Sequence, residues 1–164
     1  RVAWADHGIA SAGFRPYIVY GPGESAGIAA GPSIALRAAA RGEAAVIRFS
    51  GRVGFVHVTD VARAMVAAVR QPLTGAQVFD LCGPTEDMAT FQALLADRVP
   101  GAQVQVDGLP LTLPETLSGG ERAAWFDALP VTALADGIDQ TLAHWRGTQA
   151  GTGFRKAANV MGAI

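Results

Sequence analysis

The chain has 164 residues, of which 50% are hydrophobic and 16% are charged, and its formal net charge at pH 7 is −1. This is enough apolar material for the core of one domain or of part of a larger one, and the near-neutral charge argues against an electrostatic nucleic-acid binder. No apolar run reaches the roughly 20 residues that a membrane span needs. Cys82 is the only cysteine, so an intrachain disulfide is excluded and a reducing cytoplasm is the expected location.

The N-terminal segment predicts the end of a helix followed by an interrupted strand. Residues Arg1–His7 have the pattern of final helical turns, and Gly8 suits the left-handed position that ends a helix. Ala12–Val19 is strand-like and leads into a Tyr20–Gly23 turn. Because Pro16 cannot donate to a ladder, we expect strand pairing to be interrupted there, as at a strand end that lines a site.

The middle of the chain alternates between helical and strand periodicity. The pattern predicts helices at Pro32–Arg41, Asp60–Arg70 and Met88–Arg98, and strands at Ala45–Phe49, Val53–Val58, Val78–Leu81 and Val104–Val106. We expect Thr59 to cap the second helix, with Asp60 in its first turn, and Asp87 to cap the third. On the second helix the expected apolar face is formed by Val61, Met65, Ala68 and Val69.

The C-terminal third contains two further expected helices. Ser118 and Glu121 have capping-box spacing ahead of a short helix that ends near Phe126. A last amphipathic helix is expected at Ala133–Trp145. Its apolar positions are Leu134, Ile138, Leu142 and Trp145. We therefore expect one unit over residues 1–146 and a linker-like tail over residues 147–164, and the alternation of strands and helices predicts an α/β fold.

Four segments carry a resemblance to a known family. They are FRPYIVYGPG at Phe14–Gly23, GRVGFVHVTD at Gly51–Asp60, VFDLCGP at Val78–Pro84 and PVTALADGIDQTLAHWR at Pro130–Arg146. In this order they resemble the NAD-dependent epimerase/dehydratase group of the extended short-chain dehydrogenase/reductases, and the resemblance covers about Gly8 to Arg146. It implies the C-terminal part of a Rossmann-type doubly wound parallel sheet together with the small α/β substrate-binding lobe.

The resemblance also implies binding residues. In that family the strand ending in RP…VYGPG runs beneath the nicotinamide ring, which makes Pro16, Tyr17, Ile18 and Val19 the candidates for contact with NAD or NADP. An apolar strand end with a broken ladder is a suitable surface for a flat ring. The loop that ends at Ser33 and the helix after it belong to the substrate lobe of the family, so Ser33 is a candidate substrate-binding residue.

Arg52 is the second candidate for substrate binding. Family members that act on nucleotide sugars carry Arg-Asp directly before the F-V-H-V strand, where this chain has Val53 and Gly54. Arg52 is displaced by one residue, and a shift of one residue on a strand turns a side chain to the opposite face. Unless a bulge restores it, Arg52 is not the family's phosphate clamp. This moves the expected substrate from a nucleotide-diphosphate sugar towards a sugar acid, a lactone or a small alcohol.

No catalytic or metal-binding residue is assigned. The resemblance implies a Gly-x-x-Gly-x-x-Gly loop and a Tyr-x-x-x-Lys pair, but neither Tyr17 nor Tyr20 is followed by lysine at that spacing, and the only lysine is Lys156. We expect these motifs upstream of Arg1 in a longer protein. The chain alone is then expected to be inactive and to expose apolar surface. His57 is interpreted as a structural histidine, and the histidines and cysteine lack metal-ligand spacing.

Three functional hypotheses remain open. The first is a fragment of an NAD(P)-dependent oxidoreductase, epimerase or dehydratase that transfers hydride on a sugar or sugar acid. The second is a non-catalytic binding or structural relative of the same fold, and the third is an atypical member that reduces a non-sugar aldehyde or ketone. The expected partners are a small sugar-like substrate and, through the helix that Arg1–His7 terminates, a second copy in a homodimer, with no nucleic acid and no membrane.

Overall fold

Helices are interspersed with mostly parallel strand pairs along the described residues, which confirms the expected α/β class. The structure, a computed structural model, describes residues 1–23, 26–117 and 120–161. The helices are α1 (Val2–His7), η1 (Ile28–Ala30), α2 (Gly31–Arg41), α3 (Val58–Ala68), α4 (Met88–Arg98), α5 (Ala124–Asp127) and α6 (Leu134–Met161). The strands are β1 (Ser11–Pro16), β2 (Ile18–Tyr20), β3 (Ala45–Ile47), β4 (Arg52–His57), β5 (Ala76–Leu81), β6 (Thr85–Asp87) and β7 (Val104–Val106).

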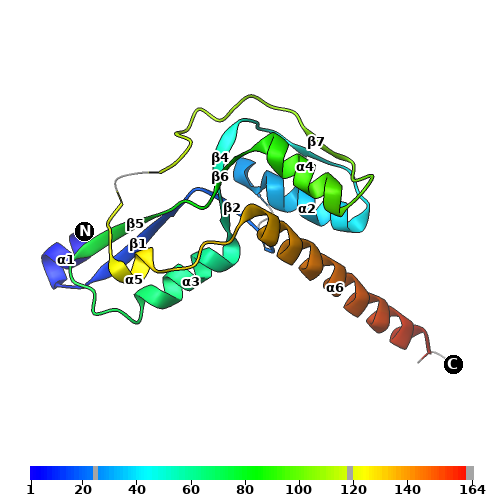
Figure 1. Cartoon of the computed structure of the whole chain (residues 1–164). Helices are drawn as coiled ribbons and strands as arrows, with labels where there is room; N and C mark the ends of the chain where they lie inside the picture. Colours follow the sequence, from blue (N-terminus) through cyan, green and yellow to red (C-terminus); the bar gives the residue numbers. More distant parts are fainter. Residues whose placement is uncertain (24–25, 118–119, 162–164) are drawn as a thin grey trace.

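The elements form two groups that lie side by side (Figure 1). In the first group, β1 and β5 pair in parallel and lie with α1, α3 and α5. In the second group, β4 pairs in parallel with β2 and antiparallel with β6, while β3 and β7 form a separate parallel pair. Helices α2 and α4 and the beginning of α6 pack against this second group.

The chain passes from one sheet to the other at Tyr17. Strand β1 ends with Pro16 opposite Leu81, and the Tyr17 N–H donates to the Leu81 carbonyl at 3.0 Å. From Ile18 onward the chain pairs with β4, where Ile18 lies opposite Phe55. The interruption that Pro16 predicts is therefore confirmed, and it marks a change of sheet.

The main core lies in the second group. Phe55 of β4 stacks on Phe91 of α4, with ring centroids 5.7 Å apart, and meets Tyr20 of β2 edge-on at 5.8 Å. Of the four apolar positions predicted for the last helix, three are buried against them and Trp145 is half-buried; the three are Leu134, Ile138 and Leu142. A smaller cluster joins α3 to the first group and contains Val56, Ala64 and Leu81, with Phe14, Phe126 and Leu129 partly buried around it.

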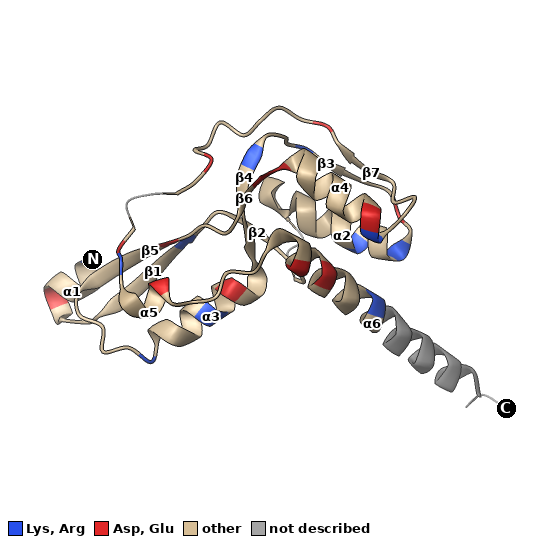
Figure 2. Cartoon of the chain, viewed as in Figure 1, with Lys and Arg blue, Asp and Glu red and all other residues tan. Residues whose placement is uncertain are grey.

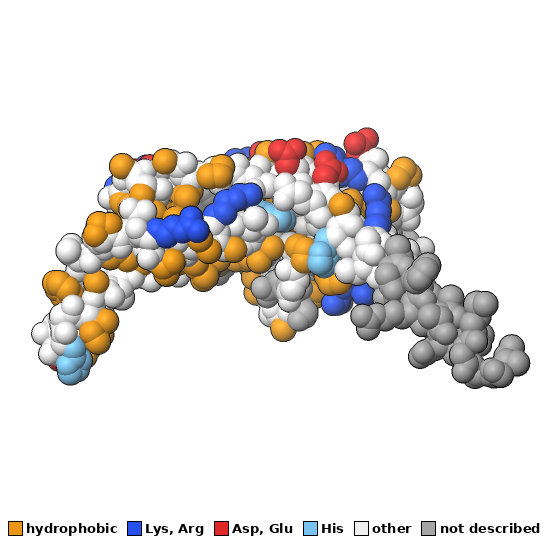
Figure 3. All heavy atoms as spheres, turned by 90° about the horizontal axis from the view of Figure 1, so that it is seen from below, with side chains coloured by type: hydrophobic (Ala, Val, Ile, Leu, Met, Phe, Trp, Pro, Cys, Tyr) orange, Lys and Arg blue, Asp and Glu red, His pale blue; other side chains and the backbone are white. Residues whose placement is uncertain are grey.

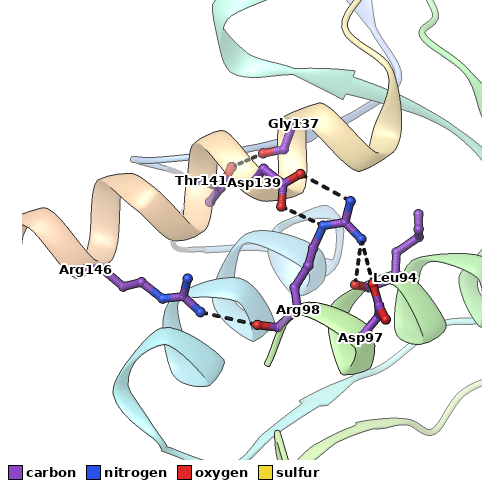
Figure 4. A network of polar contacts seen from close by, with 7 residues as sticks. All are labelled: Leu94, Asp97, Arg98, Gly137, Asp139, Thr141 and Arg146. Atoms are coloured by element: carbon purple, nitrogen blue, oxygen red, sulfur yellow. Dashed lines mark hydrogen bonds and ion pairs between the residues drawn. The ribbon is translucent and has the colours of Figure 1, made fainter. Parts of the chain in front are cut away.

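A polar network fixes α6 against α4 (Figure 4). The Arg98 guanidinium donates to both carboxylate oxygens of Asp139, at 2.6 Å and 3.2 Å, and this bond raises the pKa of Arg98. Farther along α6, Arg146 donates to the Arg98 carbonyl at 3.5 Å. A paired arginine with two-point geometry specifies the relative position of the two helices.

Several local predictions are confirmed. Gly8 and Gly42 end their helices in the left-handed conformation, with φ of 64° and 70°. Asp87 caps α4, because its carboxylate accepts from the Ala89 N–H at 2.8 Å.

The predicted cap of α3 is wrong, and its predicted apolar face is right at two of four positions. The helix begins at Val58, its N-cap is His57, and no side chain caps it. Of the expected face, Ala68 is buried and Val61 packs against the smaller cluster, whereas Met65 is 51% exposed and Val69 is 84% exposed. The early start follows from the short connection after β4, which leaves Thr59 inside the first turn.

The C-terminal third also differs from expectation. Ser118 of the proposed capping box lies outside the described residues, and α5 begins only at Ala124. Glu121 does not cap it, since the N-cap is Ala123 and no side chain bonds the helix start. Helix α6 continues to Met161, through the residues that were expected to begin a linker after Arg146. Whether residues 147–164 function apart from the rest stays a prediction.

Hydrophobic side chains are exposed on the α1 and α3 side of the molecule. The exposed large residues there are Val2, Trp4, Ile9, Met65, Val66 and Val69. Figure 3 shows hydrophobic atoms (orange) over much of this half, whereas in Figure 2 charged residues of both signs are interspersed along the ribbon. The exposed apolar surface that the sequence predicts is therefore found.

Candidate functional site

The candidate site lies where the carboxyl ends of β1 and β5 meet the second sheet. Tyr17 follows β1, and Cys82 and Gly83 follow β5. The backbone of β4 approaches them so closely that a Cβ on Gly54 would overlap the Cys82 sulfur and lie 2.9 Å from Cδ1 of Tyr17. In α/β proteins, ligands bind at the carboxyl ends of parallel strands where the topology changes. The position of Tyr17 meets this condition.

Tyr17 is half-buried and holds a segment that crosses the site. Its hydroxyl donates to the Pro114 carbonyl at 2.5 Å. Burial raises the pKa of Tyr17, and Cys82 and Glu115 raise it further. The hydroxyl is therefore a neutral hydrogen-bond donor at physiological pH, not a base.

Residues Pro114–Thr116, here called the crossing segment, make two more contacts with the site. Arg52 Nε lies 3.2 Å from the Glu115 carboxylate, and Arg52 Nη2 donates to the Thr85 carbonyl at 3.3 Å. The Thr116 hydroxyl lies 3.3 Å from the Cys82 sulfur. The crossing segment is thus attached to three site side chains, from β4, the end of β1 and the end of β5.

Two small cavities flank the end of β5. They have volumes of about 200 Å³ and 250 Å³ and share Asp80, Cys82, Arg122 and Phe126 in their walls. Asp80 is fixed, since it pairs with Arg15 at 2.7 Å and accepts from the Gly120 N–H at 2.8 Å. Each cavity is smaller than the roughly 300–1,000 Å³ of a ligand pocket. In this conformation the site is therefore narrow, with the crossing segment in place.

The four predicted cofactor residues lie at this junction but differ in exposure. Pro16 is exposed, Tyr17 and Val19 are half-buried, and the side chain of Ile18 is buried in the core. The Tyr17 N–H already bonds Leu81, so the apolar surface of the strand end is its main feature for a ring. The contact of these residues with a cofactor stays a prediction.

The two predicted substrate residues are in different environments. Ser33 is 2% exposed, and its hydroxyl accepts from the Gly21 N–H at 3.1 Å, so it supports the turn after β2. The Arg52 side chain is 51% exposed, whereas Val53 is fully buried in the core. Arg52 and Val53 therefore do lie on opposite faces of β4. Arg52 shares its face with Gly54, which is the face that meets Tyr17 and Cys82.

His57 is buried as expected of a structural histidine, but it is not fully satisfied, because its buried Nδ1 has no hydrogen-bond partner. It is 2% exposed, its ring meets Tyr20 edge-on at 5.3 Å, and Nε2 lies 3.4 Å from the Thr141 hydroxyl. Burial lowers the pKa of His57, which favours a neutral imidazole.

Asp60 has a wider role than the sequence predicts. Its carboxylate accepts from the Thr132 N–H at 2.9 Å and from the Thr132 hydroxyl at 2.7 Å, and it pairs with Arg63. It therefore connects α3 to the segment that leads into α6. The sequence contains both partners, Asp60 in the HVTD segment and Thr132 in the PVT segment, but they are 72 residues apart, so local patterns do not reveal that they pair.

No group of three or more His, Cys, Asp and Glu side chains in the described part of the chain is arranged to hold a metal ion. In the same part, no helix has the length and apolarity to cross a membrane.

The fold defines a Rossmann-type class of α/β protein. A set of solved Rossmann-type structures is similar to this chain. A partial-consensus L-threonine 3-dehydrogenase has a TM-score of 0.71 and 17% identity. The match covers 90% of this chain and 51% of the dehydrogenase. UDP-glucose 4-epimerase of Thermus thermophilus, in complex with NAD, has a TM-score of 0.65 and 20% identity. The match covers 89% of this chain and 50% of the epimerase. UDP-glucuronic acid 4-epimerase of Bacillus cereus, in complex with UDP-glucuronic acid and NAD, has a TM-score of 0.66 and 17% identity. The match covers 90% of this chain and 48% of the epimerase.

These likenesses show the fold and confirm the Rossmann-type assignment. The chain spans about half the length of each of these structures. The sequence profile of the NAD dependent epimerase/dehydratase family matches residues 1–82. This chain therefore belongs to that family. A search of curated proteins finds no significant match.

Proposed function

We propose that this chain supplies the nicotinamide-facing strand end and the substrate lobe of an NAD(P)-dependent enzyme that transfers hydride on a sugar or sugar acid. The Gly-rich loop and the Tyr-x-x-x-Lys pair of that enzyme would lie upstream of Arg1. NAD or NADP, when bound, accepts or returns the hydride. The residues of this chain bind and orient: Pro16 and Val19 present an apolar surface, and Tyr17 holds the crossing segment beside it through its hydroxyl bond to the Pro114 carbonyl.

The observation that carries the proposal is the change of sheet at Tyr17. The strand breaks at Pro16, at the carboxyl end of two parallel strands, and the second sheet begins one residue later. A change of sheet at the carboxyl ends of parallel strands is where α/β proteins bind ligands, which supports a cofactor site on one side of Tyr17 and a substrate site on the other. Membership of the NAD dependent epimerase/dehydratase family supports the same reaction class.

The substrate preference follows from Val53 and Gly54. Val53 is fully buried among the core side chains, and no side chain larger than hydrogen fits at Gly54 without moving Cys82. Neither position can present a cation to a diphosphate. Two of the similar epimerases are described in complex with UDP-glucose and UDP-glucuronic acid, but their identity to this chain is at most 21%. We therefore propose a sugar acid, a lactone or a small alcohol.

The test is a hydride-transfer assay on two proteins. The complete protein encoded around this chain and the 164-residue chain itself are each mixed with NAD or NADP and a panel of sugar acids, UDP sugars and small alcohols. Reduction of the cofactor by the complete protein alone, with sugar acids or small alcohols, supports the proposal. Turnover by the 164-residue chain, or turnover only with UDP sugars, contradicts it.

A non-catalytic relative is the second candidate. The observation that favours it is the crossing segment, which occupies the Tyr17 hydroxyl and the Arg52 guanidinium. In that case the complete protein binds neither NAD nor NADP in equilibrium dialysis. The upstream coding sequence separates the two candidates as well, since a catalytic enzyme requires a Tyr-x-x-x-Lys pair there.

A further inference from the structure

The contact of Arg52 with its carboxylate partner is looser than the pairs that Arg15 and Arg98 make elsewhere in the chain. Arg15 and Arg98 each make a two-point pair with an aspartate, with shortest distances of 2.7 Å and 2.6 Å. The Arg52–Glu115 contact is single and 3.2 Å long. Charge-assisted hydrogen bonds of full strength are about 2.7–2.9 Å long. The Arg52 pair is therefore the easiest of the three to exchange.

Solvent reaches both members of this pair. The side chains of Arg52 and Glu115 are 51% and 63% exposed. Exposed ion pairs contribute little to stability because water screens them. The Arg52–Glu115 pair therefore contributes little to the stability of the fold, although it lies on the face of β4 that meets the candidate site.

The segment that carries Glu115 has no regular secondary structure. It runs between β7 and α5, and its other side-chain contacts at the site are the hydroxyl bond of Tyr17 to Pro114 and the contact of Thr116 with Cys82. A segment held by a few polar contacts can separate from the site more easily than a packed helix. Its movement would leave the Arg52 guanidinium with its bond to the Thr85 carbonyl.

The immediate surroundings of Arg52 place no second anion on its guanidinium. Asp87 lies opposite Arg52 in the β4–β6 pair, but its carboxylate caps α4 through Ala89. Tyr17 is neutral, because its pKa is raised. Among the described residues Glu115 is the one carboxylate that pairs with Arg52.

We infer that Arg52 is the carboxylate-binding residue of the substrate site and that Glu115 is an internal stand-in, which a substrate carboxylate displaces. This inference rests on the proposed function and narrows its substrate class to sugar acids. A guanidinium receives a carboxylate through two parallel N–H donors, which a single contact to Glu115 does not use fully. The crossing segment then leaves the site when the acid enters.

The test is calorimetric titration of the 164-residue chain with D-glucuronate, and with D-glucose as the neutral sugar. Glu115→Gln removes the competing charge, so the affinity for glucuronate is expected to rise about two- to fivefold, the contribution of an exposed ion pair. Arg52→Gln is expected to lower the affinity about tenfold or more. Glucose binding should be equally weak in all variants.

Arg48→Gln is the matched control. Arg48 also pairs with a carboxylate on an exposed surface, Asp107 at 2.7 Å, but it lies outside the site, so glucuronate affinity should not change. Circular dichroism verifies that each variant is folded. The inference is overturned if Glu115→Gln binds glucuronate no better than the parent chain or not at all, or if Arg52→Gln binds it equally well. No cofactor takes part, so a failed hydride-transfer assay would refute the proposed function and leave these titrations standing.

Discussion

Replacing Asp60 by alanine should weaken the connection between α3 and the last helix. The Asp60 side chain is only 10% exposed, and its carboxylate accepts two hydrogen bonds from Thr132, at 2.9 Å and 2.7 Å, besides its pair with Arg63. The alanine variant removes all three contacts. It also leaves the partly buried N–H and hydroxyl of Thr132 without this acceptor.

The expected loss follows from the number of bonds. A hydrogen bond to a charged group contributes about 1.5–3 kcal/mol, and the second of two bonds from one residue contributes less, so we expect Asp60→Ala to lower the free energy of unfolding by about 3–4 kcal/mol. For a chain of this size that corresponds to a fall in Tm of roughly 6–15 °C. Asp60→Asn keeps one acceptor oxygen and should lose about half as much.

Urea unfolding followed by circular dichroism measures these free energies. Asp107→Ala is the control, because Asp107 also pairs with an arginine but is 71% exposed, and it should cost at most about 0.5 kcal/mol. In a double-mutant cycle with Thr132→Val, the Asp60 effect should fall only by the share of the hydroxyl bond, about 1.5 kcal/mol, because the backbone N–H of residue 132 and Arg63 still bond the carboxylate. A loss below about 1 kcal/mol for Asp60→Ala would refute the assignment of a structural role to this carboxylate.

Three further perturbations test the packing around the site. Gly137→Ala should destabilise the chain, because the new Cβ would overlap the buried Tyr20 hydroxyl. In urea unfolding, Tyr20→Phe should recover part of this loss, whereas strictly additive effects of the two substitutions would disprove the overlap. The pKa of His57 is lowered in the folded chain, so as the pH falls the unfolded chain takes up a proton before the folded chain does. The free energy of unfolding is therefore retained above a pH of about 6.5 and is lost as the pH falls towards the folded pKa. His57→Gln should flatten this dependence, and an unchanged pH profile would contradict it. Gly54→Ala should displace Cys82 and increase the rate at which its thiol reacts with a disulfide reagent, and an unchanged rate would show that the thiol has room.

The sequence predicts the local elements well where a single residue determines the backbone. Gly8, Gly42 and Asp87 end or begin helices as expected, since a left-handed φ or a carboxylate acceptor acts within a few residues. Pro16 predicts an interruption for the same reason, because it has no N–H. The interruption is found, with the change of sheet located at Tyr17.

Contacts between distant segments could not be predicted in the same way. Thr59 has the composition of a cap, but β4 runs directly into α3, and the helix begins before it. Asp60 bonds a residue 72 positions away, and Tyr17 bonds one 97 positions away. Tertiary packing decides such contacts, and periodicity carries no information on them. The two-residue alternation of a strand did predict that Arg52 and Val53 face opposite sides of β4.

The most direct test of the proposed function is the position of the cofactor in a crystal structure of the complete protein with NAD or NADP. The nicotinamide ring is expected to lie against Pro16, Tyr17 and Val19, with the crossing segment of Pro114–Thr116 next to it. A ring bound elsewhere, or a complete protein that takes up neither cofactor at saturating concentration, would contradict the proposed role of this strand end.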